Sequence, residues 1–440
     1  MSSFTTQLPS CHHEEVPHAD IAVVGAGAAG LMAAIWAARS APGRRVVALD
    51  GATHLGAKIL VAGGGRCNVT HHNVDETAYA GSSPNAIRKV LRSFDVPRTV
   101  EFFKEQGVEL KREETGKLFP TTDRARTVLN ALLNAAATAG AEILNPRRVE
   151  SIERIEAPSA EEDGAYFVVS GPWGRLHAAR VVLATGGMVL PRSGSDGVGY
   201  TFARRLGHTT PPRIFPALVP LIIPPTNPPH FIRDLSGVTL PATIEVRAGS
   251  GKKLASFTNS TLFTHFGLSG PSVLDASRYY TAAKFEDAAT HLVMNFLPGE
   301  TFETLDRRLT DLGARPVLPF LKEKLPLRLA DALCTFAAVP WRTTGATLTK
   351  EMRRALVRAI VGHAVPVGGD RGYTYAEVTA GGVPLSELHL ETMASRVCPG
   401  LHLCGEILDV DGRIGGFNFQ WAWASGYLAG MGSAASLSPR

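Results

Sequence analysis

The 440-residue chain contains few cysteines, five in all, at positions 11, 67, 334, 398 and 404. A set this sparse and odd in number excludes a disulfide scaffold and indicates a reducing, cytoplasmic compartment. Charged residues are also few, at 19% of the chain, and the net charge of +5 is only mildly basic. Such a bias suits anionic ligands such as phosphates and falls well short of a nucleic-acid signature.

Long apolar runs are absent too. No window of about 20 apolar residues predicts a membrane span. Residues 1–18 hold no Lys, no Arg and no apolar centre, so they do not form a secretory signal, and we expect a flexible leader. Cys11, His12, His13 and His18 lie in it and offer metal ligands, but a disordered polar leader is the favoured interpretation.

Glycine, by contrast, is abundant, and its first cluster has a defined context. The apolar run Ile21–Val24 predicts a buried strand, which leads into Gly25, Gly27 and Gly30 and then a helix to about Ser40. In this G-x-G-x-x-G pattern the first glycine makes the tight turn. The second lets the backbone approach a pyrophosphate, and the third lets helix and strand pack closely.

A second strand, "RRVVALD", ends in Asp50, twenty residues after Gly30. An acid at this place accepts hydrogen bonds from ribose hydroxyls. The pattern therefore predicts an adenosine with a free 2′-hydroxyl, which fits FAD or NAD better than NADP.

Further strands of the same nucleotide-binding unit lie far along the chain. Strand Val181–Ala184 leads into Thr185-Gly186, and strand Leu401–Cys404 leads into Gly405-Glu406, a Gly-Gly turn and a helix over about 419–430. A simple NAD domain would be complete within a much shorter stretch. The wide separation of these strands along the sequence favours a two-dinucleotide-binding flavoprotein with long insertions between the strands.

Six long motifs, in order, carry a specific resemblance: "VVGAGAAGLMAA", "GAKILVAGGGRCNVTH", "KLFPTTDRARTVLNALL", "VVLATGGMVLPRSGSDGVGYTFARRLGH", "LFTHFGLSGPSVLDASR" and "CGEILDVDGRIGGFNFQWAWASGYLAG". The chain resembles the HI0933-like family of FAD-dependent NAD(P)/FAD oxidoreductases, also described as aminoacetone oxidase-like or BaiN-like flavoproteins. The segment from "ATGG" to "GSDG" is more distantly similar to fumarate reductase-type flavoproteins.

The resemblance implies an α/β fold of the Rossmann-like two-dinucleotide-binding flavoprotein type with an inserted β-barrel and helical domain. We expect the FAD-binding domain to comprise residues 19–205 and 374–433, followed by a tail over 434–440. The insert would span 206–373, with a β-barrel over about 206–296 and helices over about 297–364. Alternation in "ATIEVRAGSGKKLASF" supports strands in its first half, and "EILNPRRVESIERI" is interpreted as a strand pair.

The glycines before Arg66 and Cys67 allow several interpretations: a phosphate loop, a redox cysteine, a metal site or a tight turn. Consecutive glycines let backbone N–H groups turn toward an anion. Arg66 can pair with phosphate or ribitol oxygens or form a surface ion pair, and Asn68 can bond the flavin ring. Disulfide-reductase flavoproteins carry two cysteines here, whereas this segment has one, so Cys67 is interpreted as a packing residue, with a redox role as the alternative. His71 and His72 lack partners at zinc spacing.

The resemblance also assigns the cofactor contacts. A backbone amide near Val149 would contact the adenine, and Asp409 would bond a ribityl hydroxyl. The helix after Asn418 would point its N-terminus at the pyrimidine edge and stabilise the charge of reduced flavin. The expected FAD-binding residues are Gly25, Gly27, Ala28, Ala29, Gly30, Asp50, Gly51, Lys58, Gly63, Gly64, Gly65, Arg66, Cys67, Asn68, Val149, Ala184, Thr185, Gly186, Gly405, Glu406, Asp409, Gly415, Gly416, Phe417 and Asn418.

One catalytic candidate lies in the middle of the chain. His265 precedes a helix start in which Ser269 is the expected cap and Pro271 stands in the first turn. We interpret His265 as a group for proton transfer or substrate contact, with a structural hydrogen-bonding histidine as an equal alternative. No metal is expected.

The chain shows no second G-x-G-x-x-G, so we expect no separate NAD(P)H domain. Hydride would pass between tightly bound FAD and a small organic substrate or nicotinamide in a cleft under the insert, with NAD(P)H as a candidate donor. Two alternatives are a tRNA- or RNA-modifying flavoprotein that uses basic insert helices and a non-catalytic flavin-binding protein. A solvated basic face is the commoner explanation, so we expect neither a nucleic-acid nor a membrane partner.

Overall fold

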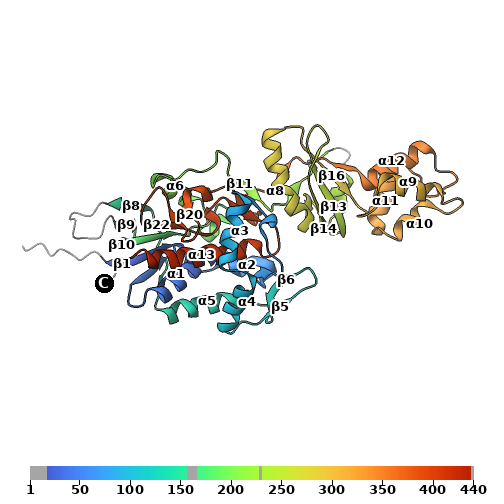
Figure 1. The fold of residues 1–440 in the computed structure, drawn as a ribbon. Helices are drawn as coiled ribbons and strands as arrows, with labels where there is room; N and C mark the ends of the chain where they lie inside the picture. Colours follow the sequence, from blue (N-terminus) through green and yellow to red (C-terminus); the bar gives the residue numbers. More distant parts are fainter. Residues whose placement is uncertain (1–16, 156–165, 227–229, 438–440) are drawn as a thin grey trace, which may run out of the picture.

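The computed structural model describes residues 17–155, 166–226 and 230–437, and the chain forms two bodies joined by a narrow junction (Figure 1). The larger body contains both ends of the described chain and is called the Rossmann body below. The smaller, drawn in green-yellow to orange, is called the insert. Of the leader, only its last residues lie within the described part, where His18 begins the first strand. Cys11, His12 and His13, for which metal binding was the less favoured interpretation, lie outside the described residues.

The centre of the Rossmann body is a parallel sheet. Its strands run in the order β22 (Leu401–Leu403), β10 (Gly174–Leu183), β1 (His18–Val24), β2 (Val46–Leu49) and β7 (Glu142–Leu144). β2, nearly all of β1 and the end of β10 are buried, as continuous apolar runs require in a parallel sheet covered on both faces. The three strands predicted around residues 21–24, 181–184 and 401–404 are therefore confirmed.

Further strands lengthen this sheet at its edges. β8 (Ser151–Ile155) and β9 (Tyr166–Gly171) form an antiparallel meander that leads into β10, while β20 (Leu388–His389) and β21 (Ala394–Ser395) flank β22. The expected strand pair in residues 142–155 is wrong in its pairing. β7 pairs with β2 and β8 with β9, because the intervening chain carries β8 away from the sheet edge that β7 occupies.

One face of the sheet carries α1 (Ala28–Ser40), α13 (Phe417–Ala435) and α5 (Ala125–Ala139) (Figure 1). The remaining elements of this body are short: α2 (Ala57–Gly65), β3 (Thr70–His71), β4 (Tyr79–Gly81), α3 (Pro84–Ser93), α4 (Val96–Glu105), β5 (Leu110–Arg112), β6 (Lys117–Pro120), α6 (Val198–Arg205) and β23 (Val410–Gly412). The helix predicted near the C-terminus is longer than expected and extends into the predicted tail.

Helices α1 and α13 cross at very short range. A Cβ on Gly426 would lie 2.5 Å from the Ala29 carbonyl oxygen, and one on Gly430 would lie 2.4 Å from the Ala33 carbonyl oxygen. Both obstacles are helix backbone, which cannot move aside as a side chain can. Glycine at these two positions therefore sets the distance between the first and last helices of the body.

The insert is built on one sheet with a helical unit at its far end (Figure 1). The sheet order is β17 (His363–Val365), β16 (His291–Asn295), β13 (Thr239–Arg247), β14 (Lys253–Thr264), β15 (Gly267–Ser269), β12 (Leu221–Ile222) and β18 (Gly369–Asp370). Helix α8 (Pro271–Glu286) lies on β13 and β14, and α7 (Phe231–Asp234) is a single turn. The helical unit contains α9 (Phe302–Thr310), α10 (Val317–Lys322), α11 (Leu327–Phe336) and α12 (Lys350–Val361).

The expected barrel is an open, curved sheet. Among the described pairings none joins its two edge strands, β17 and β18, although only residues 366–368 separate them in the chain. A link this short keeps the ends of β17 and β18 close together, so the sheet is strongly curved although no ladder joins its two edges. One buried apolar cluster runs through both the sheet and the helical unit, so the insert has a single core.

The two bodies meet at a short strand pair, β11 (Phe215–Ala217) with β19 (Val378–Ala380), and at two ion pairs beside it. Arg278 on α8 donates from Nε and Nη2 to the two oxygens of buried Asp411, at 2.8 and 3.1 Å. Arg413, beyond β23, donates to Oδ2 of Asp275 at 3.1 Å. In one pair the insert supplies the arginine, and in the other the Rossmann body supplies it. Together the two pairs form the inter-body clamp, which fixes the angle of α8 against the Rossmann body.

Replacing Gly430 with Ala should lower the free energy of unfolding by about 1–3 kcal/mol, because the added methyl overlaps the α1 backbone. A loss of stability would be informative, because helix propensity alone predicts a gain: alanine is a better helix former than glycine by about 1 kcal/mol. Urea unfolding followed by circular dichroism measures it. Ala435→Ser, in the exposed last turn of the same helix, should change stability by a few tenths of a kcal/mol (about 0.5 at most). Unchanged or higher stability of Gly430→Ala would contradict the tight crossing.

Removing one partner of the clamp should cost more than removing both. Arg278→Met leaves the buried Asp411 carboxylate without its bidentate partner, and we expect a loss of about 3–5 kcal/mol. The double variant Arg278→Met, Asp411→Leu should recover much of it. A thermodynamic cycle from denaturant unfolding measures the coupling, and strictly additive losses would show that the pair is not a coupled unit.

Candidate functional site

A cavity of about 680 Å³ opens at the carboxyl ends of β1, β10 and β22. Its walls come from the turn after β1, from α2, from the loop after β10 and from the start of α13. The junction contributes Leu218, and the insert contributes Pro271 and Leu274 from α8. Ligands of parallel α/β sheets bind outside the carboxyl ends of the strands, so the topology places a binding site here.

Nearly every cofactor residue predicted from the sequence lines this cavity. The exceptions are Gly30, Gly65, Cys67, Asp409 and Phe417. The structure thus brings together predicted residues from position 25 to position 418.

The first glycine cluster has three distinct geometries. Gly25 adopts a φ of +101°, and a Cβ on it would lie 2.5 Å from the Ala184 carbonyl oxygen. A Cβ on Gly30 would lie 1.8 Å from the Gly25 carbonyl oxygen, so this glycine serves helix packing, away from the cavity. Gly27 differs, because its φ of −76° suits any residue and no heavy atom lies within 4 Å of its missing Cβ. Only a ligand would require glycine at position 27.

Asp50 stands at the end of β2 on the cavity wall. Its carboxylate accepts hydrogen bonds from the backbone N–H groups of Ala26, at 2.7 Å, and Ala52, at 2.8 Å. It therefore braces the glycine turn. A carboxylate has about four acceptor positions, so capacity for ribose hydroxyls is left. Gly51, Arg148 and Val149 line the same end of the cavity.

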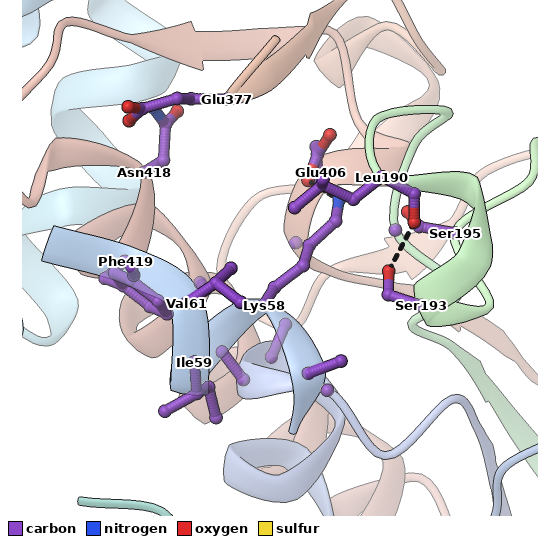
Figure 2. Close-up of a pocket in the computed structure, with 18 of the residues that line it drawn as sticks. Lys58, Ile59, Val61, Leu190, Ser193, Ser195, Glu377, Glu406, Asn418 and Phe419 are labelled. Atoms are coloured by element: carbon purple, nitrogen blue, oxygen red, sulfur yellow. Dashed lines mark hydrogen bonds and ion pairs between the residues drawn. The ribbon is translucent and has the colours of Figure 1, made fainter. Parts of the chain in front are cut away.

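The segment after β2, for which a phosphate loop was one interpretation, begins as a helix. Residues from Ala57 form the first turn of α2, and left-handed backbone at Gly63 and Gly64, with φ of +58° and +69°, then breaks the helix. The helical turn directs the Lys58 side chain across the cavity toward Glu406 (Figure 2). Lys58 Nζ lies 2.7 Å from Glu406 Oε2. The other Glu406 oxygen accepts from the Thr379 backbone N–H at 3.0 Å.

Arg66 makes the surface ion pair that was one of its two interpretations. Its Nη1 lies 2.6 Å from the Glu113 carboxylate, and its guanidinium stacks on Phe119 at 4.0 Å from the ring centre, at the edge of the cavity. Cys67 is fully buried behind the wall, and burial raises the pKa of its thiol to about 12. A thiol that stays protonated is a poor nucleophile, which favours packing over a redox role.

His71 also has ordinary partners. Its two ring nitrogens lie 2.8 and 3.0 Å from the carbonyl oxygens of Asn73 and Thr115. Within the described residues no group of three or more His, Cys, Asp or Glu side chains is arranged to hold a metal ion. The carbonyl oxygen of Phe417 accepts from the Tyr79 hydroxyl at 2.8 Å, so Phe417 braces the helix start. Asp409 lies off the cavity, where burial raises its pKa to about 6.

His265 does not reach the cavity. It is exposed in the turn between β14 and β15. The neighbouring Phe266 packs under Arg371, whose guanidinium stacks on Tyr375, which lines the cavity. His265 thus lies at the outer rim. The predicted cap of α8 is also wrong, because the cap position is Gly270, at a φ of +90°, and no side chain caps the helix.

The sequence analysis missed four charged residues that line the cavity: Arg148, at the end near Gly51, and Lys117, Glu377 and Arg413. The last three line the cavity beside the turn formed by residues 415–418. Glu377 is exposed to the open cavity, yet protein lies close around its other sides, and this desolvation raises the pKa of its carboxyl to about 7. For Glu377 the sequence offered one signal, an acid directly before the apolar strand β19. Acids in such loop positions are common, so this signal is not specific.

The wall also carries polar atoms that need partners. Asn68 Oδ1 and Thr185 Oγ1 are buried without a hydrogen-bond partner, and both residues line the cavity. The first turn of α1 has no side-chain cap, which leaves N–H groups at the positive end of the helix for phosphate. Open space at Gly27, unpaired polar atoms and a helix N-terminus fit an elongated dinucleotide.

The comparison with protein families agrees with this geometry. The description "HI0933-like protein Rossmann domain" matches residues 19–432. The chain belongs to the HI0933-like family. It is accordingly an FAD-dependent oxidoreductase, with FAD as its cofactor.

Two kinds of curated relative match over nearly the whole chain. A 3-dehydro-bile acid delta(4,6)-reductase of Clostridium scindens is 34% identical over 418 residues, which cover 94% of this chain and 98% of the relative. A ribosomal RNA dihydrouridine synthase of Haemophilus influenzae is 32% identical over 411 residues, covering 93% and 97%.

Solved structures show the fold at low identity. The 3-ketosteroid delta1-dehydrogenase of Sterolibacterium denitrificans has a TM-score of 0.50 at 14% identity and covers 96% of this chain and 100% of its own. An E. coli quinol fumarate reductase subunit has a TM-score of 0.50 at 15% identity and covers 96% and 71%. Of the helices in the described residues, none is both long and apolar enough to cross a membrane.

Replacing Gly27 with Val should weaken FAD binding by roughly tenfold or more, a change of about 1.4 kcal/mol, because the side chain would occupy space at the phosphate-binding turn. Titration of the apoprotein with FAD, followed by fluorescence quenching, measures the affinity. Thermal unfolding of the apoprotein should stay near that of the wild type, since the backbone at position 27 is unstrained. Unchanged affinity would mean that the cofactor does not approach this turn.

Proposed function

We propose that this enzyme reduces a carbon–carbon double bond conjugated with a carbonyl group, in the cavity between the Rossmann body and the insert. The two kinds of relative support this chemistry jointly. Reduction of an unsaturated 3-oxo steroid skeleton and conversion of uridine to dihydrouridine both saturate such a bond. A bound, reduced FAD supplies the hydride that this reaction needs.

The observation that carries the proposal is the composition of the cavity near residues 415–418. Leu218, Leu274 and Phe419 make part of the wall apolar, which suits a planar carbon skeleton. Lys117 and Arg413 place positive charge at the same end. A cation near the carbonyl oxygen stabilises the negative charge that develops there when hydride adds to the conjugated carbon.

The order of the two substrate classes follows from the insert. Several arginines of its helical unit are neutralised in ion pairs, such as Arg308 with Glu300, Arg353 with Asp306 and Arg315 with Glu323. This pairing favours a solvated charged face, so a small unsaturated carbonyl compound is the first candidate substrate. Uridine within ribosomal RNA is the second candidate and rests on the relative that is 32% identical. NAD(P)H is the proposed electron donor and would enter the same cavity.

Anaerobic reoxidation of the photoreduced holoenzyme tests this function. Mixing with a 3-oxo-4-ene steroid should restore the absorbance of oxidised flavin within seconds, whereas the saturated 3-oxo steroid should not, because it offers no conjugated carbon to hydride. A ribosomal RNA fragment with uridine, against the same fragment with dihydrouridine, forms the second arm. Failure of both unsaturated compounds would overturn the proposal, and success of RNA alone would select the second substrate.

A further inference from the structure

The cavity holds one acid whose position matches the second half of this reaction. Glu377 directly precedes β19, where the chain returns from the insert to the Rossmann body. Figure 2 shows its carboxylate at the same end of the cavity as Asn418. The Asn418 amide is bonded to both backbone groups of Gly412, at 2.8 and 3.0 Å, so it holds the turn over 415–418 rigidly beside Glu377.

We propose that Glu377 is the catalytic acid that protonates the substrate carbon next to the carbonyl group. The inference rests on the proposed reduction. The carbon remote from the carbonyl gains a hydride from reduced FAD, and the π electron pair forms the new C–H bond at the adjacent carbon. Glu377 supplies the proton of that bond, becomes a carboxylate, and regains a proton from water through the cavity.

The charges around Glu377 suit this role. Lys117 on β6 lowers the pKa of the carboxyl and Asp275 on α8 raises it, while burial is the largest influence and raises it. Asp275 is itself held by Arg413 and by the Ile414 N–H. A carboxyl balanced in this way exchanges its proton near neutral pH, which is what an acid needs if it is to be recharged in each cycle.

Glu406, the other acid that lines the cavity near β19, is a poorer candidate. Its two carboxylate oxygens already accept hydrogen bonds from Lys58 Nζ and from the Thr379 N–H, so both are occupied by protein donors. Asp50, at the opposite end, accepts two backbone N–H groups and is likewise held as an acceptor. Glu377 combines a place on the cavity with a carboxyl whose pKa burial raises to about 7.

The test uses the holoenzyme and the variants Glu377→Gln, Glu377→Asp and Glu286→Gln. The last changes an exposed carboxylate on α8 and serves as the control. With the unsaturated substrate, Glu377→Gln should lower kcat by about 100-fold with little change in KM, and should abolish the fall in rate above pH 7. Glu377→Asp should restore part of the rate, and Glu286→Gln should behave as the wild type. Wild-type rate and pH profile in Glu377→Gln would overturn the assignment.

A readout without substrate separates this inference from the proposed function. The absorption spectrum of bound oxidised FAD, titrated from pH 5.5 to 8.5, should shift once in the wild type and in Glu286→Gln but not in Glu377→Gln. If Glu377→Gln does not retain FAD, the same titration of Glu377→Asp should show the shift at a different pH. A shift that persists unchanged without Glu377 overturns the inference even when no substrate is reduced, and its loss supports Glu377 even when the substrate class is wrong.

Discussion

The close crossing of α1 and α13 is the contact on which the rest of the structure depends. Two glycines of α13 lie where a single methyl group would strike the backbone of α1. This contact seats the last helix of the chain against the first, although they are separated by nearly the whole sequence. The turn that precedes α13, over residues 415–418, is thereby positioned opposite the glycine turn at the start of α1. A cavity with nucleotide-binding walls on both sides follows from that position.

The insert completes the cavity at one end. Its helix α8 contributes Pro271 and Leu274 to the wall, and the inter-body clamp holds that helix in place through two buried acids. Because the clamp residue Arg413 also lines the cavity, the same charge holds the two bodies together and contributes to the electrostatics of the cavity.

The cavity wall also contains strained backbone. Leu190 and Leu218, both on the wall, have φ near +50°. Backbone held in this region is costly and persists where the surrounding structure fixes it, as in preorganised sites.

The chemistry follows from where the charges lie along the cavity. At the end near Asp50 the wall offers backbone N–H groups, a helix N-terminus and acceptors for hydroxyls, which suits a dinucleotide. At the end near residues 415–418 it offers apolar surface, two cations and the Glu377 carboxyl, whose pKa burial raises to about 7. The first set binds and orients a cofactor. In the reaction that we propose, the second set polarises a carbonyl and moves a proton.

The sequence by itself determined the cofactor class, the parallel sheet and most of the cavity wall. The sheet and the nucleotide-binding turn depend on local rules, namely buried apolar strands, a glycine turn and an acid at a fixed spacing from it. The choice of FAD and most of the predicted wall residues rest on the resemblance of long motifs to the HI0933-like family. The pairing of β7 and β8, the open sheet of the insert and the place of His265 at the outer rim were decided by tertiary structure, as was the gathering of Lys117, Glu377 and Arg413. These three residues come from separate segments with no shared motif. Their meeting depends on how the insert docks against the Rossmann body. The pKa of Glu377 depends mainly on burial, and neither docking nor burial is encoded in a local pattern.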